Sequence, residues 1–386
     1  MSRINLKNMI KRILKLVIPA KFRRVIRGIK TGSWYNEQKI KRNFNGKPLT
    51  PAMQVEIQGM IKKRSDIYLY DEKTARKLAD NWRGVINKPQ NLRFIENAVP
   101  IALCANEGFA PYMAVMLQSL MENSSQQRKY HLIIFERDFS DKTKDYLMNQ
   151  VSKFKHCEID FISIKEAFDE IPIASPLGAY YSIDAYSRLL IPYWLDKYPK
   201  VIYCDGDMIA KTDIAELYDL DIQNYCMGAA ISPTANANID NETYSFFAEW
   251  PVFLFLDKWS RYLSSGVLIF DIKRFKEKIS YQDCFKFAIY YTNRYKKNIV
   301  DQDVLSYLVG DDYFILSPEW NYVWNMLKKD GKRHYQPSEP NTKLFHFATL
   351  IKPWHNVPDI ANNPEVLAYR DYAKTIPLYS ERIMYN

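Results

Sequence analysis

The stretch Val-Ile-Tyr-Cys-Asp-Gly-Asp at residues 201–207 decides most of what this sequence predicts. Its first four residues have the apolar character of a buried strand, and two carboxylates follow directly. Alternate residues of an extended chain point the same way, so Asp205 and Asp207 can face one cation. Gly206 between them allows a ligand to approach the backbone closely. Carboxylates favour hard divalent ions such as Mn²⁺ or Mg²⁺, so the stretch predicts a metal-binding strand end.

An Asp-x-Asp pair occurs often by chance, so how strongly it indicates a metal site depends on the secondary structure elements that precede it. The predicted elements, in chain order, are a strand over 100–105, a helix over 111–122, a strand over 131–135, a helix from Ser140 to about 153, a strand over 158–164, a helix over 186–194 and the strand over 201–204. This order predicts an α/β fold with a doubly wound, mostly parallel sheet and helices on both faces. Ligands bind beyond the carboxyl ends of such strands, which places 106–109 and 205–207 on one rim.

The positive charge of the chain is concentrated at its N-terminus. The net charge is +10, with 54 Lys and Arg against 44 Asp and Glu. Residues 1–30 hold ten of the basic residues and no acidic one, so the rest of the chain is balanced. An enzyme that acts on nucleic acid would usually carry a basic face on its folded domain as well, so no nucleic-acid partner is expected.

Residues 1–30 have two short amphipathic helical patterns separated by Pro19. Such a basic helix can bind an anionic membrane surface, and each cation contributes roughly 1 kcal/mol. The alternative is a helix docked on the protein's own body. No apolar run is long enough to span a membrane, no signal peptide is evident, and five scattered cysteines fit a reducing compartment. We therefore expect a cytoplasmic protein, peripheral on the inner face of the cell membrane.

Two further polar segments lie downstream of the Asp-x-Asp pair. Asp301-Gln302-Asp303 opens a predicted helix over 304–308, where acidic residues are also favourable for the helix itself. His346 and Lys352 lie in the segment His-Phe-Ala-Thr-Leu-Ile-Lys-Pro-Trp. The imidazole could bind a metal and the ammonium a phosphate, although a lone His beside apolar residues is more often part of the core.

Taken together, the segments between residues 99 and 356 resemble glycosyltransferase family 8, the retaining, manganese-dependent enzymes of the GT-A fold that include bacterial lipopolysaccharide galactosyl- and glucosyltransferases. The matching segments, in the order of the family, are Ile-Ala-Leu-Cys-Ala-Asn106, Ala185-Tyr-Ser-Arg188-Leu, Asp205-Gly-Asp207, Ser265-Gly266-Val-Leu-Ile, Asp301-Gln302-Asp303, Pro318-x-Trp320-Asn321 and His346-x5-Lys352-Pro-Trp.

The resemblance implies a role for each matching position. Asp205, Asp207 and His346 would coordinate Mn²⁺, with Mg²⁺ possible, and the ion would bridge the diphosphate of a UDP-sugar donor. On the donor side, the implied contacts are Lys352 to the diphosphate, Arg188 near the phosphate and sugar, Asp301 to sugar hydroxyls, and Asn106, Gly206 and Ser264 around the rest of the donor.

Gln302 would lie on the reacting face of the anomeric carbon. Retaining glycosidases use a carboxylate nucleophile at the equivalent stage, whereas the amide of Gln302 is a poor nucleophile. We therefore expect attack by the acceptor on the same face, with the amide carbonyl stabilising the oxocarbenium-like transition state. The alternative is a covalent intermediate on another side chain.

Four positions depart from the family pattern: Asn106 replaces an Asp facing the uracil, Gly108 a polar residue, Ser264 an Asn and Thr349 a Gly. The metal and phosphate residues are retained, which predicts an active enzyme with altered donor choice rather than a decayed one. The aromatic-rich stretch at 236–262 is either an acceptor-side wall or a buried helical hairpin.

The predicted organisation is a membrane-surface arm (1–30), a helical linker region with helices over about 51–63 and 72–86 (31–95), a GT-A domain (96–356) and a C-terminal helical extension (357–386). The predicted function is transfer of glucose or galactose from a UDP-sugar to a saccharide or glycolipid acceptor in surface glycan synthesis. Two alternatives remain: a membrane-tethered, non-catalytic nucleotide-sugar binder, and a phosphohydrolase of the haloacid-dehalogenase type, which also places Asp-x-Asp after a buried strand.

Overall fold

The computed structural model describes residues 72–84, 88–89, 92–173, 183–232, 261–294, 301–324, 326–329, 332–335, 339–348, 351–356 and 358–381. The predicted arm at 1–30, the predicted helix at 51–63, Thr349 and nearly all of the aromatic stretch lie outside these ranges. None of the helices within them has both the length and the apolar character needed to cross a bilayer.

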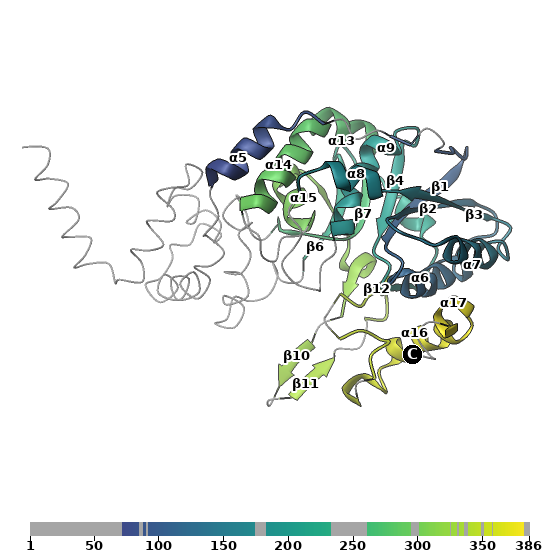
Figure 1. Cartoon of the computed structure of the whole chain (residues 1–386). Helices are drawn as coiled ribbons and strands as arrows, with labels where there is room; N and C mark the ends of the chain where they lie inside the picture. The colour runs from purple at the N-terminus through teal and green to yellow at the C-terminus, as the bar shows by residue number, and fades with distance from the viewer. Residues whose placement is uncertain are drawn as a thin grey trace, which may run out of the picture.

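A seven-stranded sheet forms the centre of the molecule (Figure 1), with strand order β3-β2-β1-β4-β7-β6-β8. Its strands are β1 (Ala98–Ala105), β2 (Lys129–Glu136), β3 (Cys157–Ser163), β4 (Lys200–Cys204), β6 (Met227–Ile231), β7 (Leu263–Asp271) and β8 (Phe314–Ile315). Strands β1 to β4 pair in parallel, as the sequence predicts. Strand β7 runs antiparallel to both β4 and β6, so the sheet is mostly but not wholly parallel.

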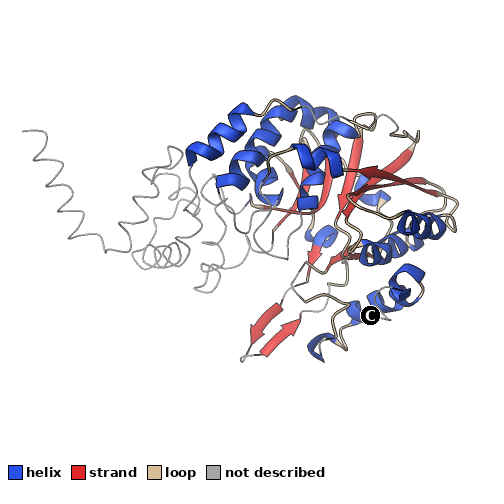
Figure 2. Ribbon diagram, in the orientation of Figure 1, coloured by secondary structure: helices blue, strands red, loops and turns tan. Residues whose placement is uncertain are grey.

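Helices cover both faces of this sheet (Figure 2). On one face lie α5 (Glu72–Asn81), α8 (Lys165–Glu170), α9 (Ile191–Trp194), α13 (Ile272–Lys278), α14 (Tyr281–Arg294) and α15 (Asp301–Val309); on the other lie α6 (Ala110–Glu122), α7 (Asp141–Val151), α10 (Ala215–Tyr218), α16 (Pro364–Lys374) and α17 (Pro377–Tyr379). Alternate residues of β1 divide between the two apolar layers, since Ala102 packs into one, and Ile101 and Leu103 into the other. The predicted doubly wound fold is confirmed.

A small second sheet, of strand order β5-β12-β9, lies beyond the carboxyl end of β4. Its strands are β5 (Met208–Ala210), β9 (Tyr322–Val323) and β12 (Leu344–His346), and the 3₁₀ helix η4 (Pro318–Asn321) packs against β12. A separate hairpin of β10 (Met326–Lys329) and β11 (Lys332–Tyr335) projects from the body (Figure 1). In the small sheet His346 pairs with Met208, and Phe347 N–H donates to the Asp207 carbonyl at 3.0 Å. This pairing brings the end of β12 beside the Asp-x-Asp turn.

The predicted helix over 186–194 is two elements in the structure. A 3₁₀ helix, η1, covers Ile183–Leu190, and α9 starts at Ile191. The reason is Pro192, which has no backbone N–H to donate to the preceding turn and whose ring clashes with it. A continuous α-helix cannot cross that position, so Pro192 lies in the first turn of a new one.

Candidate active site

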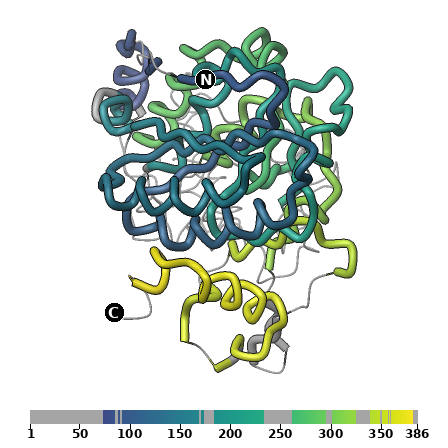
Figure 3. Tube along the Cα trace, turned by 90° about the vertical axis from the view of Figure 1, so that its right-hand side faces the viewer, coloured from purple at the N-terminus to yellow at the C-terminus, as the bar shows by residue number. Residues whose placement is uncertain are grey.

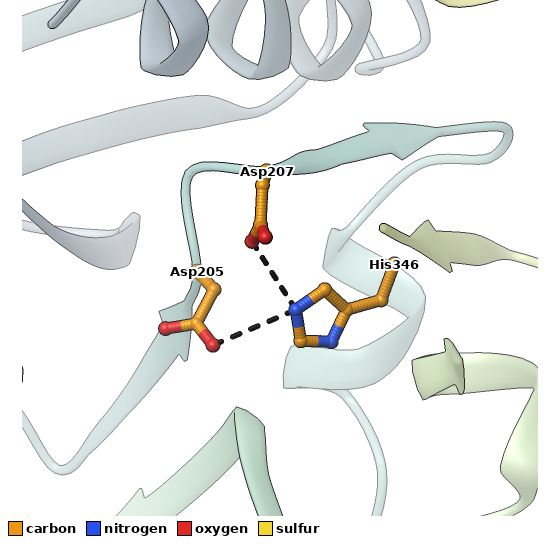
Figure 4. Close-up of side chains that lie close together, drawn as sticks. All are labelled: Asp205, Asp207 and His346. Carbon is orange, nitrogen blue, oxygen red and sulfur yellow. Dashed lines mark ion pairs between the residues drawn. The ribbon is translucent and has the colours of Figure 1, made fainter. Parts of the chain in front are cut away.

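Three side chains from two distant segments converge where β4 meets the small sheet. Asp205 follows the last residue of β4, Asp207 precedes β5, and His346 ends β12. The His346 Nε2 atom lies 3.2 Å from Asp207 Oδ1 and 3.7 Å from Asp205 Oδ2 (Figure 4). One ligand atom from each residue lies within 4.8 Å of the others. The structure therefore places together the three residues predicted to bind the metal.

Two glycines lie where the chain packs closely around these side chains. A Cβ atom on Gly266, in β7, would lie 2.4 Å from His346 Cε1, 2.6 Å from its Nδ1 and 3.2 Å from Asp205 Oδ2. A Cβ atom on Gly206 would lie 3.1 Å from the Phe109 ring and from Met113 Cβ. A side chain at position 266 would therefore force His346 or β7 to shift, whereas one at position 206 would need Phe109 and Met113 to move by a few tenths of an ångström.

Asn321 fixes the orientation of the His346 ring. The Asn321 Oδ1 atom lies 2.9 Å from His346 Nδ1, and Asn321 Nδ2 donates to Ser264 Oγ at 2.9 Å. An amide oxygen only accepts hydrogen bonds, so Nδ1 carries the hydrogen and the Nε2 lone pair faces the two carboxylates. Metal-binding histidines are commonly held in this way. Ser264, predicted to contact the donor, is buried and supports His346 through Asn321.

Replacing Asn321 with Ala should weaken Mn²⁺ binding by roughly 10- to 100-fold, the usual effect of removing a group that orients a metal ligand. The His346 ring could then rotate, and its tautomer would no longer be fixed. Titration of Mn²⁺ followed by electron paramagnetic resonance (EPR) measures this. Ser264→Ala should have a smaller effect in the same direction, because Asn321 keeps its bond to His346. An unchanged Mn²⁺ affinity in Asn321→Ala would refute the orienting role.

Lys352 places a cation directly against the site. Its Nζ atom donates to Asp207 Oδ2 at 2.6 Å and to the Phe347 carbonyl at 2.6 Å. Burial raises the pKa of Asp207, but the Lys352 and His346 side chains together hold it well below its usual range. Asp207 is therefore ionised at neutral pH and is paired with the Lys352 ammonium.

Arg188 links Asp205 to Asp301. Its Nη2 atom lies 3.0 Å from Asp205 Oδ1 and its Nε atom 2.9 Å from Asp301 Oδ2, while Nη1 donates to the carbonyl and hydroxyl of Ser265. The Tyr203 hydroxyl also donates to Asp205 Oδ1, at 2.7 Å. Burial raises the pKa of Asp301 to about 6, and Arg188 opposes this shift only in part. At neutral pH the Asp301 carboxylate therefore prevails and can accept hydrogen bonds.

The remaining predicted residues lie at the edges of this cluster. Gln302 Oε1 accepts a hydrogen bond from Ser265 N–H at 3.0 Å, which ties the start of α15 to β7. Asn106, at the end of β1, accepts from Phe109 N–H and donates to Asp184 Oδ2 at 3.2 Å. The amide of Asn106 is thus engaged in its own turn and with a buried carboxylate.

The sequence prediction missed four residues that shape the site: Tyr203, Ser265, Gly266 and Asn321. Three of them stand in segments that carried the family resemblance, and Tyr203 lies two positions before Asp205. For Ser265, Gly266 and Asn321, their place in these segments was the only sign in the sequence that they could belong to the site. Their roles were not readable, because each acts through a partner that is distant in the sequence.

Residues 100–357, more than half of the chain, match the model of the family described as Glycosyl transferase family 8. The chain belongs to this family. Two relatives are General stress protein A from Bacillus subtilis, 24% identical over 71% of this chain and 93% of its own length, and the Lipopolysaccharide 1,2-glucosyltransferase of Escherichia coli, 21% identical over 65% and 71%.

Among solved structures, the family 8 chain is similar to the galactosyltransferase LgtC in complex with donor and acceptor sugar analogs. The TM-score is 0.56, at 16% identity over 72% of this chain and 96% of LgtC. This likeness confirms the GT-A fold, and the family assignment confirms a glycosyltransferase. Sugar transfer is thereby favoured over the haloacid-dehalogenase-type phosphohydrolase.

Proposed function

We propose that this family 8 protein is a retaining, metal-dependent hexosyltransferase that moves glucose or galactose from a UDP-sugar to a saccharide or glycolipid acceptor in surface glycan synthesis. The observation that carries the proposal is the convergence of Asp205, Asp207 and His346, with the Lys352 ammonium 2.6 Å from Asp207. The names of the glucosyltransferase relative and of LgtC support the choice of sugars.

The three side chains Asp205, Asp207 and His346 suit a divalent metal ion. They offer two carboxylates and one imidazole nitrogen whose lone pair faces them, within the spacing that one ion can bridge. Oxygen-rich sets with one imidazole suit Mn²⁺, and Mg²⁺ is possible. When bound, such an ion would supply electrostatic stabilisation of the donor's diphosphate as negative charge builds on it.

The surrounding side chains would hold the donor. We propose that the Lys352 ammonium leaves Asp207 when the donor binds and pairs with the diphosphate instead. Its positive charge would then stabilise the diphosphate as this group departs. Arg188 would keep Asp205 and Asp301 in place, and the Asp301 carboxylate would accept hydrogen bonds from sugar hydroxyls. Asn106 would face the base, and Gly206 would let the donor approach the backbone.

For the transfer step we propose that the acceptor attacks the anomeric carbon on the same face from which UDP leaves. The acceptor oxygen would form a bond to the anomeric carbon while the bond from that carbon to the UDP oxygen breaks, and the acceptor proton would pass to the departing diphosphate. Gln302 would lie beside the anomeric carbon, where its carbonyl dipole stabilises positive charge. A trapped glycosyl adduct on any side chain would contradict this route.

Hydrolysis and transfer assays with a set of nucleotide sugars test the function. We expect slow Mn²⁺-dependent release of UDP from UDP-glucose or UDP-galactose, weaker activity with Mg²⁺ and none with a chelator. UDP binding without any hydrolysis or transfer would favour a non-catalytic binder instead. Activity that persists in the chelator would refute the metal-dependent proposal.

We also propose that residues 1–30 place the enzyme on the inner face of the cell membrane. The proposal rests on ten basic residues without an acidic one. Deleting 1–30 should release the protein from sedimenting vesicles that contain phosphatidylglycerol and leave donor hydrolysis unchanged. Neutral phosphatidylcholine vesicles, which should bind neither form, are the control. If the shortened chain still sediments with the anionic vesicles, the arm is not the anchor.

A further inference from the structure

The C-terminal helices lie beyond the residues that match the family model, yet α16 contacts the segment that carries Lys352. Helices α16 and α17 pack against α6, whose first turn follows the donor-side rim at the end of β1 (Figures 1 and 3). The segment 351–356, which carries Lys352, lies between α16 and the site. The contacts across this segment are specific, and they begin with one arginine.

Arg370 holds the turn that carries Lys352. Its Nε atom donates to the Pro353 carbonyl at 3.0 Å, and its Nη2 atom donates to the His355 carbonyl at 3.1 Å. The turn is closed by His355 N–H donating to the Lys352 carbonyl at 3.0 Å. One guanidinium thus binds two carbonyls of a single turn, through two donors that its planar fork holds in a fixed geometry.

An aromatic cluster fixes the same turn from the side. Trp354 stacks on Tyr112 of α6, with ring centroids 3.8 Å apart and planes at 16°. Tyr369, the residue before Arg370, packs against Trp354 with the ring centroids 5.7 Å apart, and its side chain is fully buried. Phe109 also contacts Trp354, and Phe109 is the ring that a Cβ on Gly206 would meet. The cluster therefore joins α16 to both the Lys352 turn and the Asp-x-Asp turn.

We propose that Arg370 is a positioning residue, which holds the 352–355 turn so that the Lys352 ammonium reaches Asp207 and, in turn, the diphosphate of the donor. This rests on the proposed function, since it assigns Lys352 to the donor's diphosphate. The C-terminal extension is then part of the active site. Arg370 acts only through the turn, so its effect should depend on the presence of Lys352.

A double-mutant cycle on the full chain separates this role from general support of the fold. We would compare the parent, Arg370→Ala, Lys352→Ala and the double variant, and measure the Kd of UDP at saturating Mn²⁺ by calorimetry. Coupled residues lose additivity, whereas independent ones add. Arg370→Ala should weaken UDP binding about tenfold in the parent, corresponding to about 1.4 kcal/mol, and should have almost no effect in the Lys352→Ala background.

Mn²⁺ binding without UDP gives a second, opposite readout. The Lys352 ammonium and the metal compete for Asp207, because both cations bind the same carboxylate. Arg370→Ala should loosen the turn and therefore tighten Mn²⁺ binding several-fold, as measured by EPR. This size is typical of the interaction energy between residues in contact. The effect should appear only while Lys352 is present. A merely structural defect would weaken metal binding instead.

Two variants serve as controls for these measurements. Lys374→Ala removes an exposed cation from the same helix and should change neither constant, since Lys374 pairs with Asp371 at the surface. Arg370→Lys should be intermediate, because it keeps the charge and can reach one carbonyl. Thermal melts check folding, and Arg370→Gln, which retains an N–H₂ donor, replaces Arg370→Ala if that variant does not fold.

The outcomes distinguish the two proposals. Equal effects of Arg370→Ala with and without Lys352 would overturn the positioning role and leave the proposed function intact. A parent protein that binds neither Mn²⁺ nor UDP would overturn the proposed function, and this inference with it. Coupling to Lys352 in UDP binding, seen as an Arg370→Ala effect that disappears in the Lys352→Ala background, together with tighter Mn²⁺ binding that needs Lys352, would establish it.

Discussion

Asp207→Ala should abolish Mn²⁺-dependent donor binding and sugar transfer. Asp207 contacts His346 at 3.2 Å through one oxygen and Lys352 at 2.6 Å through the other. Its removal leaves one carboxylate and one imidazole for the ion, and the Lys352 ammonium loses the carboxylate that it pairs with. Since disturbing only a supporting group costs 10- to 100-fold in metal affinity, we expect the loss of a direct ligand to exceed about 100-fold.

EPR titration of Mn²⁺ and calorimetry with UDP measure the two affinities. Asp207→Asn separates charge from shape, because the amide keeps the volume and loses the negative charge; it should be nearly as defective as Asp207→Ala. Asp219→Ala, which removes an exposed carboxylate paired with Arg128, is the control and should behave like the parent. Parent-like Mn²⁺ affinity in Asp207→Ala would remove this residue from the metal site.

Gly266→Ala should disable the site through a single added methyl group. The new Cβ would lie 2.4 and 2.6 Å from two atoms of the His346 ring. The ring cannot withdraw freely, because Asn321 holds its Nδ1 side. Either His346 leaves the carboxylates or β7 shifts, and overpacking of this kind typically costs about 1–3 kcal/mol of stability. We expect Mn²⁺ affinity to fall by at least about tenfold, corresponding to about 1.4 kcal/mol of binding free energy.

Gly108→Ala is a matched control for this substitution. A Cβ there would meet only Asn106 Oδ1, at 3.5 Å, which is an ordinary contact. Gly108 is exposed on the same rim, so the same change should leave both Tm and Mn²⁺ affinity close to those of the parent. If Gly266→Ala also binds Mn²⁺ like the parent, the close approach of β7 to His346 does not limit the site.

The long elements were predictable because each repeats one pattern over many residues. Strands such as β2, which is buried along nearly its whole length, and helix α7, capped by Ser140, stand out from the sequence alone. The β-α-β-α-β order then predicts the sheet and the rim on which Asp205 and Asp207 lie. The direction of β7 was not predictable in this way, because it depends on the path of the chain between β6 and β7.

The position of His346 could not be predicted from the residues around it in the sequence. Strand β12 has three residues and β5 has three, too few for a periodic signal. Taken alone, a His among apolar residues is more often a core residue, and His346 is indeed buried. Only the family resemblance indicated a metal ligand. The antiparallel register of β12 on β5 then explains physically how His346 reaches Asp207.

The pairing of β5 with β12 also determines when the site can form during synthesis of the chain. During synthesis the two aspartates leave the ribosome well before the histidine, directly after strand β4, whose parallel partner β1 is already made. A nascent or prematurely ended polypeptide would present the carboxylates without the imidazole that completes the set. The set of three side chains is therefore complete only after β12 has been synthesised and has paired with β5.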